Sequence, residues 1–304
     1  MLKRNDALIG PPEDERQPRA TPVRTLVFVA LAMTAFAANS VFCRKALAQT
    51  AIDPASFTLV RIASGAAMLY LLTRLKHSDG GVTGSWQGAF ALFAYAVCFS
   101  FAYITLSAGT GALLLFGAVQ ATMILRGLFG GERLSLLQWS GLGLALAGLA
   151  ALLAPGVTAP EPVGALLMVV AGVAWGAYSL LGRSRSSGPL AATAGNFLRA
   201  TPLALAVVAA VALRTHVDWD MAGLTYAVAS GALASGVGYA LWYAALPGLN
   251  AATAASVQLS VPVITALGGA LLLHEAITPR LSIASLAVLG GIAMVIWVRR
   301  TPAR

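Results

Sequence analysis

Long stretches without charge are the feature that most constrains the fold of this chain. Only 10% of its 304 residues are Asp, Glu, Lys or Arg, and 58% are hydrophobic, whereas about 25% of a soluble domain is charged. A helix needs about 20 apolar residues to cross the hydrocarbon of a bilayer, since it rises about 1.5 Å per residue. Helices also satisfy their own backbone polar groups, which hydrocarbon requires. The sequence therefore predicts an all-α polytopic membrane protein.

The breaks between apolar runs predict ten transmembrane helices joined by short loops. Asp53 followed by Pro54 is typical of a helix start, with an acidic N-cap and proline in the first turn. No segment is long enough to form a separate soluble domain. The predicted spans are 24–46, 54–74, 86–106, 108–128, 136–154, 161–182, 193–213, 222–246, 250–273 and 280–298.

Two short segments lie outside the predicted spans. Residues 1–23 combine four prolines with mixed charges and are expected to form a disordered cytoplasmic tail, and residues 299–304 form a second one. The first span resembles a signal peptide, with basic residues before it and Ala46-Leu47-Ala48 after it. Arg44 and Lys45 directly precede that site, which disfavours cleavage. We therefore expect the first span to stay in the mature protein.

The placement of Lys and Arg predicts the orientation in the membrane. If the N-terminus is cytoplasmic, most of the 20 basic residues fall in cytoplasmic segments. Such an excess is the usual sign of the cytoplasmic side. With ten spans, both termini are then cytoplasmic, in a bacterial inner membrane. The basic residues on the outer side are Arg44, Lys45, Arg214 and Arg280, and those within spans are Arg61 and Arg199.

The two halves of the chain match at a nearly constant separation of 138 to 143 residues. Because five spans is an odd number, the two halves would lie in opposite orientations, as an inverted repeat. Chance similarity between helices rich in Ala, Leu and Gly is the alternative. The matched pairs include Glu132 with Glu275, Gly148 with Gly291, Ser40 with Ser179, Arg44 with Arg183, and Arg61 with Arg199.

One motif is similar to that of a known family. Gly131-Glu132-Arg133-Leu134 follows a Tyr-x-x-Leu turn and a helix of small residues, and a Gly/Ala/Leu-rich helix comes next. This arrangement resembles the EamA-type permeases of the drug/metabolite transporter superfamily, over residues 24–298. The resemblance implies two inverted five-helix repeats, 24–158 and 159–298, around a central cavity. It also implies export of amino acids or similar metabolites.

The chain departs from this pattern in two places. In the second half, the hinge reads His274-Glu275-Ala276-Ile277 rather than Gly-Glu-Arg-Leu. The ninth span carries Pro262, as is usual in the family, and this proline removes a backbone hydrogen bond and is expected to loosen the helix. In the first half, the fourth span has no proline and carries Gln120 nearby. Both departures count against equivalent movement of the two halves.

Aromatic residues in helical spacing are the main candidates for a binding site. Four tryptophans fall at span ends or in a loop, as in an interfacial belt, whereas Trp175 and Trp242 lie further inside. A Tyr or Trp within a span needs a partner for its polar atom, which lipid cannot supply. The rings would therefore face the bundle interior, either lining a cavity or packing between helices. The candidate rings are Tyr95, Phe99, Tyr103, Trp175, Tyr178, Tyr239, Trp242 and Tyr243.

Polar residues within spans complete the candidate set. Arg61 and Arg199 are symmetry-related, and a charge at the centre of a span costs about 2.5–3.5 kcal/mol on insertion scales. A substrate carboxylate or phosphate, a gating contact, or snorkelling would each offset that cost. Asn39, Gln120 and Gln258 are amides that both donate and accept, so they would either hold a zwitterion or join helices.

Several function classes find no support in the sequence. There is no phosphate-binding G-x-x-x-x-G-K-[ST] motif for ATP hydrolysis. The three histidines are scattered without metal-ligand spacing, and all 11 acidic residues fall in the tail, loops or span ends. We expect no enzyme activity, no cofactor, no metal and no nucleic-acid partner. Without a carboxylate inside a span, a buried proton or sodium relay has no basis.

The sequence therefore predicts a transporter that exports small organic metabolites, amino acids and aromatic ones among them, by alternating access. An uncoupled facilitator or channel is the first alternative, and a non-transporting scaffold is the second. The expected partners are a small-molecule substrate and the lipid bilayer. The spacing of Gly141 and Ala145 suits close helix packing, either within the chain or across a homodimer.

Overall fold

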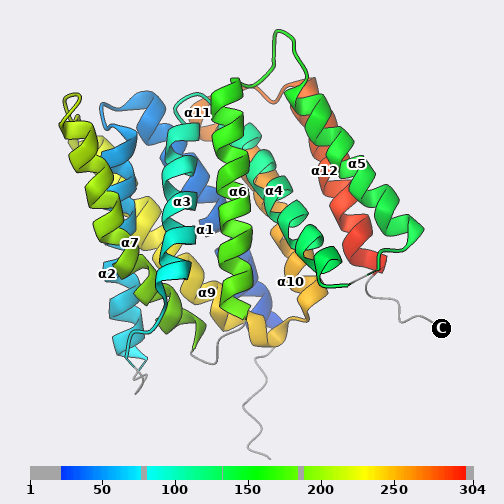
Figure 1. The fold of residues 1–304 in the computed structure, drawn as a ribbon, viewed down its shortest axis with the longest axis horizontal. Helices are drawn as coiled ribbons and strands as arrows, with labels where there is room; N and C mark the ends of the chain where they lie inside the picture. The colour runs from blue at the N-terminus through cyan, green and yellow to red at the C-terminus, as the bar shows by residue number, and fades with distance from the viewer. Residues whose placement is uncertain (1–21, 77–80, 132, 184–187, 299–304) are drawn as a thin grey trace, which may run out of the picture.

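The computed structural model describes residues 22–76, 81–131, 133–183 and 188–298, and all regular structure in these ranges is helical (Figure 1). The predicted tails lie outside them, apart from Pro22 and Val23 at the start of the first helix. In chain order the helices are α1 (Pro22–Gln49), α2 (Pro54–Leu75), α3 (Trp86–Ala102), α4 (Ala108–Phe129), α5 (Leu136–Leu153), α6 (Pro162–Arg183), α7 (Pro189–Ala212), α8 (Met221–Val228), η1 (Ala229–Val237), α9 (Gly238–Ala245), η2 (Leu246–Gly248), α10 (Ala251–Gln258), α11 (Ser260–Leu273) and α12 (Pro279–Val298).

These helices form the ten predicted spans. Nine spans in the described ranges are long and apolar enough to cross a membrane, and α3, with 17 residues, is a shorter apolar helix. The eighth span is continuous through α8, the π-helical segment η1 and α9. The ninth is α10 followed by α11, with a break at Leu259. This break lies next to Pro262, as the sequence analysis predicted, because proline cannot donate a hydrogen bond to the carbonyl of Gln258.

The chain alternates between two ends of the bundle. We call the end where α1 begins and α12 ends the lower end, and the opposite one the upper end (Figure 1). α1 runs upward, whereas α6, the first helix of the second half, runs downward. The predicted inverted repeat is therefore the architecture of the chain. A structure of this kind places corresponding loops of the two halves at opposite ends.

Side chains just before several helices cap the free backbone N–H groups of the first helical turn. Asp53 accepts hydrogen bonds from the backbone nitrogens of Ala55 and Ser56, at 2.9 and 3.0 Å, and Pro54 follows it, as predicted. Before α6, the backbone N–H of Gly164 and then that of Val163 donate to Glu161, which lowers the pKa of this exposed carboxyl. Such caps satisfy donors that have no partner within the helix.

The π-helical segment η1 lies directly against α2. A Cβ atom on Gly231 would overlap the carbonyl oxygen of Arg61 and the side chain of Ser64, so only glycine allows this approach. A π-helical turn widens a helix locally and is frequent at functional sites. Here the close contact fixes the backbone of Arg61 against the eighth span.

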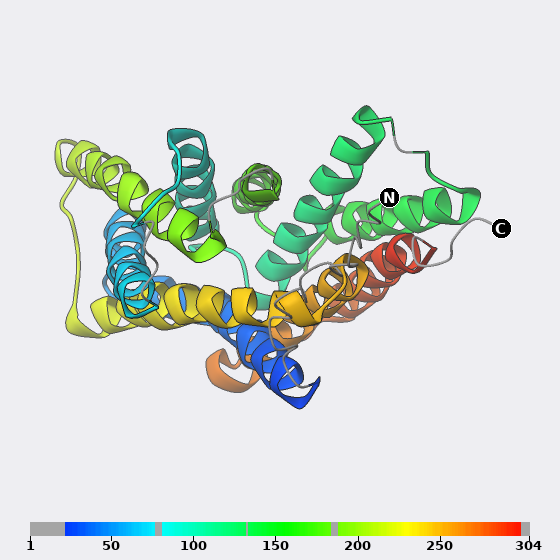
Figure 2. The same cartoon turned by 90° about the horizontal axis from the view of Figure 1, so that it is seen from below.

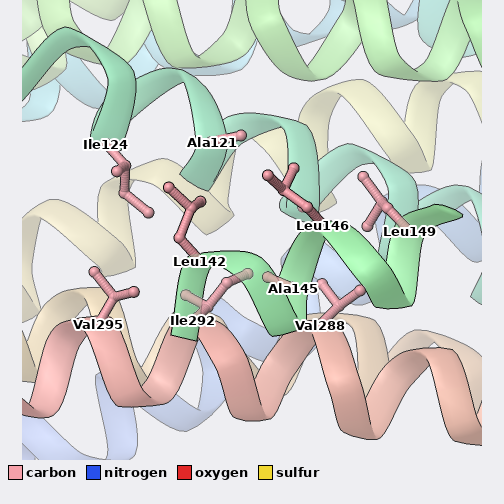
Figure 3. Close-up of a pocket in the computed structure, with 10 residues that line it drawn as sticks. Ala121, Ile124, Leu142, Ala145, Leu146, Leu149, Val288, Ile292 and Val295 are labelled. Carbon is pink, nitrogen blue, oxygen red and sulfur yellow. The ribbon is translucent and has the colours of Figure 1, made fainter. Parts of the chain in front are cut away.

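α5 and α12 form a close pair at one side of the bundle (Figures 1 and 2). A Cβ atom on Gly141 would lie 2.6 Å from the carbonyl oxygen of Gly291, so the two backbones touch. Ala145 lies at the same contact. These small residues therefore pack within the chain, and a homodimer stays a prediction. Figure 3 shows the seam where this pair meets α4, lined by aliphatic side chains with space of only about 10 Å³.

The Gly141 contact gives a matched test of this packing. Gly141→Leu must push α5 and α12 apart, and we expect the unfolding free energy to fall by about 1–3 kcal/mol. Gly143 lies two residues away with nothing within 4 Å of its Cβ position. Gly143→Leu should leave stability unchanged. Thermal unfolding in detergent, followed by fluorescence and size exclusion, measures both variants. Equal stability of the two would contradict the packing described.

Candidate functional site

A cavity of about 490 Å³ lies between the two halves. This volume falls within the range of small-molecule sites, about 300–1,000 Å³. Its lining includes residues at the lower ends of α3, α6 and α7, such as Gly88, Gly182 and Pro189, and no residue from the loops at the upper end. Ten of the thirteen predicted site residues line it: Asn39, Tyr95, Phe99, Gln120, Trp175, Tyr178, Tyr239, Trp242, Tyr243 and Gln258.

Aromatic rings from both halves meet around Trp175 of α6. Its ring centroid lies 4.8 Å from that of Tyr95 and 5.2 Å from that of Tyr178. The ring of Tyr239 stacks on Trp175 at 5.7 Å with an interplanar angle of 24°, and Tyr243 follows at 6.0 Å from Tyr239. Offset and tilted pairs at these distances are favourable geometries for aromatic rings. The cavity thus has a wall of flat apolar surface edged by hydroxyl groups.

The tryptophans divide as the sequence analysis predicted. Trp175 and Trp242 line the cavity. The other four are exposed on the outside of the protein, with Trp297 71% exposed. Exposed tryptophans at helix ends suit the membrane interface, whereas the two interior ones lie where that role does not apply. The i, i+3, i+4 spacing of Tyr239, Trp242 and Tyr243 on one helical face also brings all three to the cavity.

A buried polar network lies beside the upper part of the cavity. The hydroxyl of Ser230 in η1 donates to Oδ1 of Asn39 at 2.6 Å. Nδ2 of Asn39 donates to the Tyr95 hydroxyl at 3.3 Å, and NH2 of Arg61 donates to the same oxygen at 2.7 Å. The network joins α1, α2, α3 and η1, so it links both halves of the chain.

Arg61 lies behind this network and does not line the cavity itself. Its side chain is only 2% exposed, and its guanidinium carbon lies 5.0 Å from the ring centroid of Tyr95 and 4.7 Å from that of Phe99. NH1 of Arg61 has no hydrogen-bond partner. No carboxylate in the described ranges pairs with this cation, whose burial is costly. Stacking on two ring faces offsets part of that cost.

A second polar network lies nearer the lower end. The hydroxyls of Thr193 and Tyr243 are 2.8 Å apart, and the Tyr178 hydroxyl donates to Thr193 at 3.3 Å. Nδ2 of Asn196 donates to Tyr178 at 3.4 Å, while its Oδ1 accepts from the backbone nitrogen of Ser85 at 2.8 Å. This network connects α6, α7 and α9 with the loop before α3, and it fixes the hydroxyl edge of the aromatic wall.

At the upper end, one ion pair joins the two halves. Nε of Arg44 in α1 lies 3.0 Å from Oε1 of Glu275, in the loop between α11 and α12. NH1 of Arg44 donates to the carbonyls of Tyr103 and Ile104, at 3.0 and 2.8 Å. Oε2 of Glu275 accepts from the backbone nitrogen of Ala108, at 2.7 Å. We call these five residues the upper latch; it ties α1, the α3–α4 loop and the α11–α12 loop together.

Three predicted site residues do not line the cavity, namely Arg61, Tyr103 and Arg199. α3 ends at Ala102, so Tyr103 is past the helix end and its ring packs under Gly111 of α4. Arg199 donates through NH1 to the carbonyls of Thr83 and Gly195, at 2.7 and 3.0 Å. The two symmetry-related arginines therefore have different surroundings: one is buried beside the cavity, and the other binds a loop.

Thr193 and Asn196 line the cavity although they were not among the predicted site residues. The seventh span was predicted to start at 193, which placed Thr193 at a helix end. The helix in fact begins at Pro189, one turn earlier. Gly188 followed by Pro189 is a signal for that start. It would have placed Thr193 inside the span together with Asn196, on one face at a spacing of three.

Comparison with known proteins agrees with this architecture. A model of the EamA-like transporter family matches residues 23–154 and 162–297, one match in each half. The chain is 58% identical over 274 residues to an uncharacterized protein of Pseudomonas aeruginosa, over 90% of this chain and 94% of that protein. A protein of known crystal structure shares the fold, with a TM-score of 0.65 at 18% identity over 92% of this chain and 99% of its own. With its two inverted five-helix halves around a central cavity, the chain belongs to the EamA-like transporter family.

Proposed function

We propose that this protein exports small organic metabolites, amino acids with aromatic side chains among them, across the bacterial inner membrane by alternating access. The observation that carries the proposal is the cavity itself. It is lined by rings and amides from both halves and reaches the lower end, and at the upper end the latch joins the two halves without lining the cavity. A site that is open to one side at a time is what alternating access requires.

The distribution of basic residues supports an orientation for this state. Lys and Arg are concentrated in the segments of the lower end, so we place that end in the cytoplasm, with both termini. The conformation is then open to the cytoplasm and closed to the outside. Export would begin from this state, with substrate entering from the cytoplasm past the ends of α6 and α7.

Transport should depend on the ring of Trp175, which contacts three other rings of the cavity wall. Trp175→Leu removes that surface, and we expect uptake of labelled phenylalanine into proteoliposomes to fall at least tenfold. Trp297→Leu is the matched control, because its ring is 71% exposed at the end of α12. Normal uptake by Trp175→Leu, with folded protein in both variants, would argue against a binding role for the aromatic wall. Repeating the assay with a pH gradient separates coupled transport from facilitated flux.

The upper latch should control access from the outer side. With Cys43 and Cys98 changed to Ala, a reporter cysteine at Ser235→Cys lies in the cavity. Glu275→Gln weakens the charge-assisted hydrogen bonds that Glu275 makes in the upper latch, and each such bond contributes about 1.5–3 kcal/mol. We expect it to speed labelling by a membrane-impermeant thiol reagent from the outer side about tenfold.

Arg280→Gln is the control for this experiment. Arg280 also lies at the upper end and donates to the carbonyl of Ala154, but at the α5–α12 pair and away from the cavity. Labelling of this variant should match that of the parent protein. Equal outer-side labelling of parent and Glu275→Gln would rule out the latch as the closed gate.

A further inference from the structure

The hydrogen-bond directions at the upper end of the cavity select for a particular chemical group. The Tyr95 oxygen accepts two hydrogen bonds, from NH2 of Arg61 and from Nδ2 of Asn39. A phenolic oxygen has two lone pairs and one hydrogen. Both lone pairs are therefore occupied, and the hydroxyl hydrogen must point away from these two donors. No residue in the described ranges accepts it, while the side chain of Tyr95 lines the cavity.

The distances around the Asn39 amide support the assignment of Asn39 as a donor to Tyr95. Its Oδ1 lies 2.6 Å from the Ser230 hydroxyl, which is an O–H···O distance and short for an N–H donor. Its Nδ2 lies 3.3 Å from the Tyr95 oxygen, within N–H···O range. The amide oxygen is thus engaged by Ser230, and the amide nitrogen is left to donate to Tyr95.

The same place has a second donor without an acceptor. NH1 of Arg61, on a side chain that is 2% exposed, has no hydrogen-bond partner. A guanidinium that donates to a phenol also polarises its O–H bond and makes it a stronger donor. Tyr95 therefore brings a hydroxyl donor to the cavity, and the buried cation behind it has no carboxylate partner in the described ranges.

The rest of the cavity offers nothing that would pair with a cation through charge. Its lining residues include no Asp or Glu. The acidic side chains in the described ranges lie in loops or at helix ends, and Glu275 is engaged in the upper latch. Below Tyr95 the wall continues with the rings of Trp175 and Tyr239.

We propose that Tyr95 forms a carboxylate subsite. Arg61 and Asn39 donate hydrogen bonds to its oxygen, and the Arg61 cation lies behind it. The transported substrate is then an organic carboxylate whose apolar or aromatic body lies against Trp175 and Tyr239, and its amino group is dispensable. This inference rests on the proposed transport function and narrows the substrate class. Tyr95 contacts the carboxylate, and Arg61 acts through Tyr95 as a positioning residue.

Three ligands with the same ring and chain test the proposal. 3-Phenylpropionate carries only the carboxylate, phenylalanine carries both groups, and phenethylamine carries only the amine. Binding to the purified protein is measured by calorimetry and by the shift in thermal unfolding, independently of flux. We expect 3-phenylpropionate to bind at least as tightly as phenylalanine, and phenethylamine to bind at least tenfold more weakly. Equal or tighter binding of phenethylamine, or no binding of 3-phenylpropionate, would overturn the subsite.

Two variants address the residues directly. Tyr95→Phe keeps the ring and removes the donor, so the affinity for 3-phenylpropionate should fall about tenfold or more, as expected for a lost hydrogen bond to a charged group. Tyr70→Phe is the control, because the Tyr70 hydroxyl also accepts from an arginine, Arg74, but on an exposed face of α2. Its affinity should equal that of the wild type. An unchanged affinity of Tyr95→Phe would contradict the proposal.

Asn39→Asp covers the case in which Tyr95→Phe does not fold. The added carboxylate has the shape of the amide, accepts the free Tyr95 hydrogen and pairs with Arg61. The thermal midpoint of unfolding should stay equal or rise. Binding of 3-phenylpropionate should be lost, because the new carboxylate of the protein occupies the donors that the ligand carboxylate would use. A purely structural network would gain stability and keep its ligand affinity, and that result would refute the subsite. Binding without flux in the wild type would instead refute transport and leave the subsite standing.

Discussion

Hydrocarbon offers no hydrogen-bond partner, and this constraint brings polar side chains from different spans of this protein together inside the bundle. Asn39, Tyr95 and Ser230 come from three different helices, yet each finds its partner in the other two or in Arg61. Thr193, Tyr178 and Asn196 do the same at the other network. Polar groups that must meet one another rather than lipid are drawn to the axis of the bundle. The cavity forms where they converge.

The same constraint makes the ends of the bundle decisive. Inside the membrane the two halves meet through apolar and aromatic surfaces and through the network of Asn39, Arg61, Tyr95 and Ser230. At the upper end they are joined by Arg44 and Glu275, with charge-assisted bonds to backbone groups of the α3–α4 loop. Directional bonds of this kind exist in one arrangement or are broken, so they suit a two-state gate. The alternating access that we propose needs a second arrangement, and an inverted repeat is the architecture in which such arrangements are found.

The comparison of Arg61 with Arg199 shows how a repeat becomes asymmetric. They occupy equivalent places in the two halves, but one lies beside the Tyr95 network and the other binds the carbonyl of Thr83. The two arginines therefore occupy equivalent positions in the sequence repeat but have different surroundings in the structure. A substrate that is itself asymmetric, with a charged end and an apolar end, is matched by a site of this kind.

Much of this fold could be read from the sequence, because hydropathy and the spacing of rings are local properties. The ten spans and the shared face of Tyr239, Trp242 and Tyr243 follow from the period of a helix. Tyr103 shows the limit of that argument: its spacing continues the stripe of α3, but the helix stops one residue earlier. The pairing of Arg44 with Glu275 joins segments from opposite ends of the chain. No local pattern contains that information.

The central claim is that the upper and lower ends of the cavity open in alternation, and distances between spin labels test it most directly. Labels at Gln49 and Ile277 report on the upper end, and labels at Gln87 and Pro247, next to the lining residues Gly88 and Leu246, report on the lower end. In lipid, we expect two distances at each end, a longer one for the open state and a shorter one for the closed state. When the population of the longer upper distance rises, that of the longer lower distance should fall. Distances that stay fixed, or that lengthen together at both ends, would contradict it.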